Sequence, residues 1–177
     1  MSEYPSRLVD RWLTLELFTN FHRITGQLWT AELRTNGVLN SSDSQVLLER
    51  VTTTPLLRPT ANTIESGFAR INKNSIVMAV PNDSHEKDRL AQAARIYFRG
   101  ELMQYRVLMV LGNFEISGNL HLEPELELTQ VLLQREENFI GMTDVNINFL
   151  PNPALRVTAN SVLINRSKVD FLCAGAP

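Results

Sequence analysis

The chain has 177 residues, of which 44% are hydrophobic and 20% are charged, and its formal net charge is −2. This composition is typical of a folded globular protein and excludes a disordered chain, and the small negative charge gives no overall attraction to nucleic acid. No segment approaches the roughly 20 apolar residues that span a bilayer, and no apolar leader follows a basic N-terminus. We therefore expect a cytoplasmic protein of bacterial type with no membrane partner.

The first half of the chain has the pattern of a β-rich unit with one short helix. Apolar runs and turn residues predict two strands, the helix and three more strands, at 12–19, 21–29, 46–48, 51–57, 68–73 and 75–80. Gly26 marks a bulge or sharp bend inside the second strand, because glycine removes the steric bar to unusual dihedrals. Ser42 or Asp43 can cap the helix, and Lys73-Asn74 suits the turn between the last two strands.

A charged segment and an apolar segment separate the two halves. Residues 83–89 carry mostly charged side chains, and apolar and aromatic side chains then recur at helical spacing from Leu90 to Phe98. Gly100 is placed to end such a helix. The pattern predicts an amphipathic connecting helix that packs its apolar face on the β-rich units. The main competing interpretation is a helix that gives way to a strand from Arg95.

The second half has the same pattern in a clearer form. Strands are predicted at 105–111, 114–122, 138–149, 157–164 and 168–173, with a helix from Pro124 to about Arg135. Proline is tolerated in the first turn of a helix. The strand over 138–149 changes its apolar phase between Met142 and Val145. Since strand alternation has a period of two, an extra residue is needed, and we predict a bulge at Thr143-Asp144.

A hexamer that occurs twice is the strongest sign of an internal duplication. Residues 45–50 are Gln-Val-Leu-Leu-Glu-Arg and residues 130–135 are Gln-Val-Leu-Leu-Gln-Arg. Three other blocks match in the same order: 20–28 with 113–120, 58–62 with 156–160, and 71–73 with 164–166. The offset is 92 at the glycines of the first block, 85 at the hexamers, 98 at the Thr-Ala-Asn block and 93 at the last. We ascribe these differences to loop length.

The hexamer predicts the same short core helix in each copy. Its inward-facing residues are expected to be Val46, Leu47 and Leu48 in the first copy and Val131, Leu132 and Leu133 in the second.

Together these patterns predict an all-β protein. Its expected architecture is two tandem five-stranded antiparallel small barrels or bent sheets, each with one short helix, joined by the amphipathic helix. The predicted divisions are a first repeat over 1–82, a helical connector over 83–103 and a second repeat over 104–177. Because each unit is marginal in core size, we expect the two to bury their open faces against each other as a pseudo-symmetric pair.

The second copy resembles an uncharacterised bacterial family of β-rich domains, here present as two tandem copies. The residues that carry the resemblance are Gly118, Leu132-Leu133, Phe139-Ile140-Gly141-Met142-Thr143-Asp144 and Ile164-Asn165-Arg166. In the first copy, Val51-Thr52-Thr53-Thr54 replaces the Phe-Ile strand. The family has no assigned activity, so the resemblance implies a fold and no catalytic residue. The closing hairpin at 164–169 is also similar to that of Sm-like barrels, which oligomerise and bind RNA, an analogy of fold alone.

Residues that carry chemistry are scattered along the chain. The histidines His22, His85 and His121 lack the spacing of a metal site, and Cys173 sits in an apolar run that favours a buried thiol. Asp144, at the predicted bulge, is expected to accept hydrogen bonds from backbone N–H groups. No nucleophile, phosphate-loop or dinucleotide motif occurs, so we expect no enzyme, no metal and no cofactor.

Two groups of residues are candidates for binding. Arg95 and Arg99 flank Tyr97, an arrangement that can neutralise phosphates and stack bases, or that forms only the rim of an amphipathic helix. Lys73 and Arg166 each follow an asparagine at a hairpin tip, where a basic residue keeps the tip soluble or marks a contact point.

The sequence favours a non-enzymatic module for protein interaction or assembly. Its expected partner is another protein or a second copy of the same chain. The open alternatives are a small-barrel module that binds nucleic acid or a ligand, and an enzyme with its site between the two copies.

Overall fold

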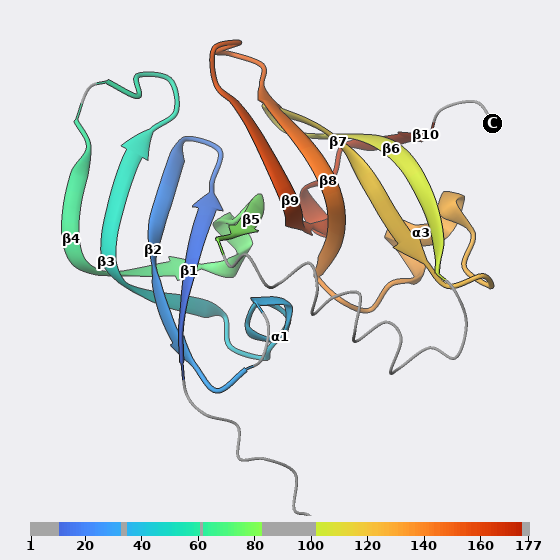
Figure 1. The fold of residues 1–177 in the computed structure, drawn as a ribbon, viewed down its shortest axis with the longest axis horizontal. Helices are drawn as coiled ribbons and strands as arrows, with labels where there is room; N and C mark the ends of the chain where they lie inside the picture. The colour runs from blue at the N-terminus through green and yellow to red at the C-terminus, as the bar shows by residue number, and fades with distance from the viewer. Residues whose placement is uncertain (1–10, 33–34, 61, 83–101, 175–177) are drawn as a thin grey trace, which may run out of the picture.

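The computed structural model of the chain describes residues 11–32, 35–60, 62–82 and 102–174. The ten strands in these ranges form one antiparallel sheet in the order β10-β6-β7-β8-β9-β5-β1-β2-β3-β4 (Figure 1). The strands are β1 (Arg11–Phe18), β2 (His22–Thr30), β3 (Gln45–Pro55), β4 (Ile64–Asn72), β5 (Met78–Pro81), β6 (Met103–Leu111), β7 (Phe114–Leu122), β8 (Phe139–Phe149), β9 (Arg156–Asn165) and β10 (Phe171–Ala174). The predicted all-β class is confirmed.

Short helices interrupt the strands at matching places in the two halves. In the first half, α1 (Thr35–Leu39) follows β2 and the 3-10 helix η1 (Lys73–Ser75) follows β4. In the second half, η2 (Leu128–Gln130) and α3 (Val131–Gln134) follow β7, and η3 (Arg166–Lys168) follows β9. Each half therefore contains two strands, a short helix, two strands, a 3-10 helix and a last strand.

The two halves join edge to edge, through β5 and β9. Met78 pairs with Ile164 and Ala79 pairs with Leu163, both antiparallel. The expectation that the halves would bury their open faces against each other is therefore wrong. The physical reason lies in the backbone, because an edge strand carries a row of unpaired N–H and C=O groups that a second edge strand can satisfy.

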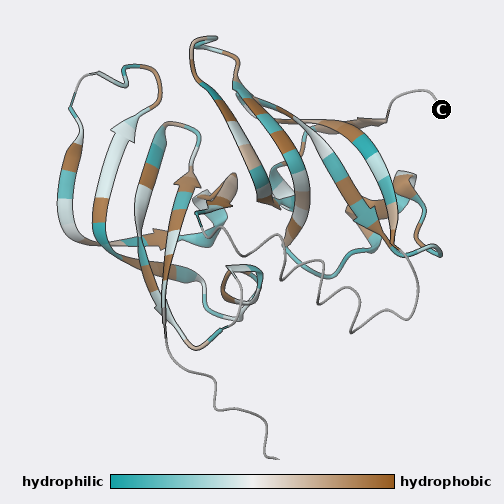
Figure 2. Ribbon diagram, viewed as in Figure 1, coloured by the Kyte–Doolittle hydropathy of each residue, from teal (hydrophilic) through white to brown (hydrophobic). Residues whose placement is uncertain are grey.

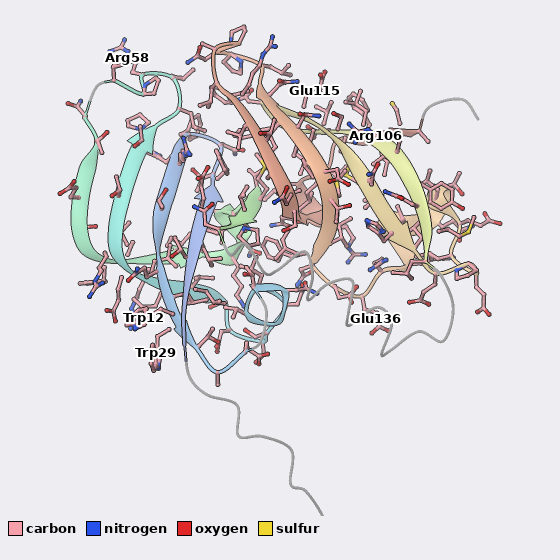
Figure 3. The ribbon with its side chains drawn as sticks, in the orientation of Figure 1. Trp12, Trp29, Arg58, Arg106, Glu115 and Glu136 are labelled. Carbon is pink, nitrogen blue, oxygen red and sulfur yellow. The ribbon has the colours of Figure 1, made fainter. Side chains whose placement is uncertain are left out.

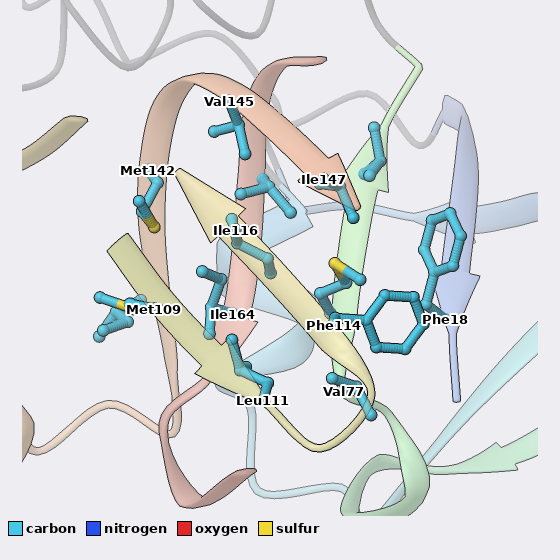
Figure 4. Close-up of a cluster of buried hydrophobic side chains, with 14 of the residues drawn as sticks. Phe18, Val77, Met109, Leu111, Phe114, Ile116, Met142, Val145, Ile147 and Ile164 are labelled. Atoms are coloured by element: carbon cyan, nitrogen blue, oxygen red, sulfur yellow. The ribbon is translucent and has the colours of Figure 1, made fainter. Parts of the chain in front are cut away.

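Buried side chains form two hydrophobic clusters, and each cluster takes residues from both halves. The larger lies mainly in the second half, where Phe114 contacts Phe149 with ring centroids 5.1 Å apart. Phe18 of β1 reaches into it, and its ring centroid lies 5.8 Å from that of Phe114 (Figure 4). The smaller cluster contains most of the first-half core together with Phe139 and Leu163. Along the strands, apolar and polar residues alternate in the way that one buried face requires (Figure 2).

A β-bulge stands at the same place in each half, opposite a glycine. In the second half Asp144 and Val145 both oppose Gly118, and Asp144 has a φ of 52°, which confirms the predicted bulge. In the first half Arg50 and Val51 oppose Gly26, and Arg50 has the same φ of 52°. The irregularity predicted at Gly26 is therefore present, but its extra residue belongs to the neighbouring strand.

The hexamer is not a repeated helix. Residues 45–50 begin β3, where Val46 and Leu48 are buried and Leu47 is exposed, the alternation of a strand. The helix of the first half is α1, which precedes the hexamer and contributes Leu39 to the core. In the second copy residues 128–134 are helical, and Pro124 lies outside the helix.

Three further expectations need correction or lie outside the described residues. Leu133 is 81% exposed, so it is not a core residue, because α3 is a single turn whose inward face is taken by Val131. Cys173 is exposed, since β10 lies at an edge of the sheet. The predicted connector falls outside the description as far as residue 101, and Met103 already belongs to β6.

Candidate assembly edges

The sheet ends in two edge strands of unlike sequence, β4 and β10. Within the described residues, β4 pairs only with β3, and β10 pairs only with β6. The two strands lie at opposite ends of the molecule (Figure 1). An edge strand with an open row of backbone donors and acceptors is a template for pairing with another chain.

The β4 edge is long and carries exposed apolar side chains. It spans nine residues, Ile64–Asn72, and contains no proline. Ile64 is 60% exposed and Phe68 is 65% exposed. Natural edge strands are often protected by proline or by brevity, and β4 has neither device, although Glu65 and Arg70 give it two charges.

The β10 edge is short and uncharged. Its four residues are Phe171, Leu172, Cys173 and Ala174, and Phe171 is 50% exposed. Strand β10 therefore presents an apolar edge without proline or charge.

The junction between β5 and β9 shows how two edges of this sheet join. The backbone N–H of Asn165 donates to the carbonyl of Val77 at 2.9 Å. The side chain of Asn165 donates through Nδ2 to the carbonyl of Ile76 at 2.9 Å, and Asn165 is buried. Met78 and Ile164 are fully buried where the strands pair.

Asn40 adds a second polar bridge across this junction. It follows α1 of the first half, and its side chain contacts the first residue of β8 in the second half. Its Nδ2 donates to the carbonyl of Phe139 at 2.9 Å, and its Oδ1 accepts from the N–H of Phe139 at 2.8 Å. The junction is therefore held by apolar burial together with two asparagines that satisfy backbone groups of the other half. Asn40 had no signal in the sequence beyond its place in a turn.

Asn72 of β4 is the counterpart of Asn165, 93 residues earlier. Each asparagine caps the following 3-10 helix: the N–H of Asn74 donates to Asn72 Oδ1 at 2.9 Å, and that of Ser167 donates to Asn165 Oδ1 at 3.1 Å. In both halves the residue after the asparagine donates its N–H to the segment that leads into the neighbouring strand. Lys73 N donates to Ser44 O at 2.9 Å, and Arg166 N donates to Asn138 O at 2.8 Å. Since successive N–H groups point to opposite sides of a strand, the N–H of Asn72 faces the open edge.

The basic residues predicted as contact points lie at these tips, and both secure a short helix. Lys73 Nζ donates to the carbonyl of Val38 at 2.8 Å and to the carbonyl of Ser41 at 3.1 Å. Burial lowers the pKa of the Lys73 ammonium, and the nearby Asp43 carboxylate partly offsets this shift. Arg166 donates through Nη1 to the carbonyl of Leu132 in α3 at 2.9 Å. These contacts give both residues a structural role.

The remaining predicted binding residues, Arg95, Tyr97 and Arg99, lie outside the described residues. Asp144, singled out as an acid at a bulge, accepts from Asn119 Nδ2 at 3.4 Å, while Arg106 Nη1 donates to its backbone carbonyl at 3.0 Å.

A second exposed surface lies on the outer face of the first half. Trp12 and Trp29 pair across β1 and β2 with their ring centroids 5.0 Å apart in an edge-to-face arrangement (Figure 3). The neighbouring Leu47 of β3 is also exposed. A pocket of about 550 Å³ is lined by Trp29, Leu47 and Arg70, among others. We name Trp12, Trp29 and Leu47 the tryptophan surface.

Comparison with known proteins found no match. The chain matches no family model, no curated protein and no solved structure. No helix in the described ranges has the length and apolarity needed to cross a bilayer.

Proposed function

We propose that the protein is a non-enzymatic assembly module that joins other protein chains by extending its sheet at the β4 and β10 edges. One observation carries the proposal: the chain already uses edge pairing, at β5 and β9, to unite its own halves. Among the residues that the structure describes, the two remaining edges have no strand partner, and they bear exposed apolar side chains. In strand addition the main-chain hydrogen bonds supply affinity and the flanking side chains supply specificity.

The experiment that tests the proposal removes one outward-facing N–H from β4. The N–H groups of Asn72 and Arg70 face the open edge, because alternate residues of a strand point to the same side. Arg70→Pro deletes such a donor and leaves the hydrogen bonds between β3 and β4 intact. We expect size-exclusion chromatography with light scattering to show association of the wild type that rises with concentration. Arg70→Pro should weaken this association by about tenfold or more.

The matched control is Arg70→Ser, which removes the charge and keeps the N–H. It should associate at least as well as the wild type, because the edge donor remains. A wild type that stays monomeric at all concentrations, with the outward-facing amides of β4 and β10 unprotected in hydrogen exchange, would count against the proposal. Equal association of Arg70→Pro and wild type would show that β4 is not the contact.

The tryptophan surface supports a second candidate function, the binding of single-stranded nucleic acid. Exposed aromatic rings are the platform on which bases stack, and Arg70 lies in the adjacent pocket. The chain contains only two tryptophans, Trp12 and Trp29, so intrinsic fluorescence reports on this surface alone. Titration with a single-stranded oligonucleotide should quench the emission, and the effect should diminish as salt is raised. Unchanged emission at low salt would eliminate this candidate.

A further inference from the structure

We infer that the partner of the open edges is a second copy of this chain, with β4 of one molecule paired antiparallel to β10 of the next. This inference rests on the proposed function and adds the identity of the partner and the register of the contact. Its basis is the correspondence between the inner junction and the two open edges. Strand β4 is the counterpart of β9, and β10 is the counterpart of β5, each at a shift of 93 residues.

Applying the shift of 93 residues to the β5–β9 pairs gives the residue pairs of the proposed contact between molecules. The pair Met78–Ile164 becomes Phe171 of one chain with Ile71 of the next, and the pair Ala79–Leu163 becomes Leu172 with Arg70. Phe171 thus takes the place of Met78, which is fully buried at the inner junction. The exposed apolar ring is thereby removed from water.

The hydrogen bonds carry over in the same way. The bond from Asn165 N to Val77 O becomes Asn72 N to Asp170 O of the next chain. The bond from Asn165 Nδ2 to Ile76 O becomes Asn72 Nδ2 to Val169 O. Asn72 already has the local cap geometry of Asn165, so its side chain needs no rearrangement to make this contact.

The β4 and β10 edges belong to opposite ends of one molecule, so the contact is head-to-tail and each copy leaves one edge open for the next. Such heterologous contacts form rings when the rotation closes and open filaments when it does not. The outer contact is more polar than the inner one, because Arg70 stands where Leu163 is buried and Gln45 stands where Phe139 is buried. Association is therefore reversible.

Disulfide trapping tests the register. The chain with Arg70→Cys, Leu172→Cys and Cys173→Ser places its two cysteines opposite each other only between molecules, since β4 and β10 end the sheet on opposite sides. Directly opposed residues lie about 4.5–5.5 Å apart, within the range of a disulfide. We expect a ladder of covalent oligomers on mild oxidation, visible on a non-reducing gel.

The control shifts one cysteine by two residues along the same face of β4, as Phe68→Cys with Leu172→Cys and Cys173→Ser. The cysteines are then diagonal neighbours about 7–8 Å apart, and cross-linking should be about tenfold slower because a gap beyond about 7 Å is not bridged without backbone movement.

Three results would overturn the inference. Association with equal cross-linking of both pairs would mean a different contact and leave the assembly function standing. Cross-links in a chain that carries Cys173→Ser with only Arg70→Cys or only Leu172→Cys would mean the same. A monomer that forms no cross-link at any concentration would overturn both the inference and the assembly function.

Discussion

Asn165 donates its side-chain Nδ2 to the backbone carbonyl of Ile76 at 2.9 Å, and so ties the end of β9 to the segment that enters β5. Its counterpart Asn72 makes the same cap of a 3-10 helix at the surface of the molecule. Asn72 therefore measures what the cap alone contributes to the free energy of unfolding, and Asn165 measures the cap together with the junction bond.

Alanine at each asparagine should give different losses of stability. Asn165→Ala removes the cap and leaves the buried carbonyl of Ile76 without its donor, which should cost about 2–3 kcal/mol. Asn72→Ala removes only an exposed cap and should cost about 0.5–1 kcal/mol. Urea unfolding measures both. Equal losses would mean that the bond to Ile76 contributes nothing to the junction.

Aspartate at the second leucine of each hexamer, Leu48 or Leu133, should destabilise the protein at the first position and be tolerated at the second. Leu48 is fully buried in β3, so Leu48→Asp should unfold the first half, since an unpaired carboxylate in an apolar core is strongly unfavourable. Leu133 is 81% exposed, and Leu133→Asp should change the free energy of unfolding by less than about 0.5 kcal/mol. Leu47→Asp is the neighbouring control in β3. Circular dichroism on heating distinguishes these outcomes.

Gly118 should tolerate no larger residue, because it lies opposite the bulge. A Cβ added there would lie 2.9 Å from Met142 Cε and 3.2 Å from the carbonyl oxygen of Thr143. Gly118→Ala should therefore cost about 1–3 kcal/mol. Gly141→Ala is the control, since its nearest contact would be Leu163 Cδ2 at an ordinary 3.8 Å. Chemical unfolding of the two variants tests the difference, and a neutral Gly118→Ala would contradict the close approach.

Lys73 should make stability depend on pH on the alkaline side. Burial lowers the pKa of its ammonium below the ordinary value of 10.5, so the unfolded chain binds more protons than the folded chain in the window below 10.5. The free energy of unfolding should therefore rise with pH through that window. Unfolding of wild type and Lys73→Met at pH 8 and pH 10 isolates this contribution. A difference between them that does not change with pH would refute the prediction.

The strands were predictable because their signals are local. The run over 114–122 matches β7 residue for residue. The phase change between Met142 and Val145 located the bulge at Asp144, since an added residue in a period-two pattern leaves a visible shift. The order of apolar and polar residues is therefore enough to locate a strand and a bulge within it.

The two hexamers have nearly the same sequence but do not occupy the same place in the fold. Two blocks, at offsets 92 and 93, occupy matching places in β2 with β7 and at the ends of β4 with β9. The blocks at offsets 85 and 98 do not: 45–50 is strand where 130–135 is largely helix, and 58–60 is loop where 156–160 is strand. The alternation of buried Val46 and Leu48 with exposed Leu47 was the signal of a strand.

The contacts at the junction between the two halves could not be predicted from the sequence. The contact of Asn40 with Phe139 joins residues 99 positions apart, and nothing in either local segment specifies the other. The repeated Ile-Asn-Lys and Ile-Asn-Arg tips did mark the place. Asparagine at a tip predicts a turn or a cap, which accounts for the caps and gives no sign of the bond from Asn165 to Ile76.

The covalent link between the halves also determines how many halves a larger assembly can contain. Each chain contributes two five-stranded halves, so a head-to-tail array contains an even number of halves. A closed ring with an odd number of halves is therefore excluded. Strong and weak seams alternate along it, because the β5–β9 seam buries Leu163 where the outer seam holds Arg70. Dilution therefore separates the molecules at the outer seams and leaves each β5–β9 seam intact. The products are whole chains rather than separated halves.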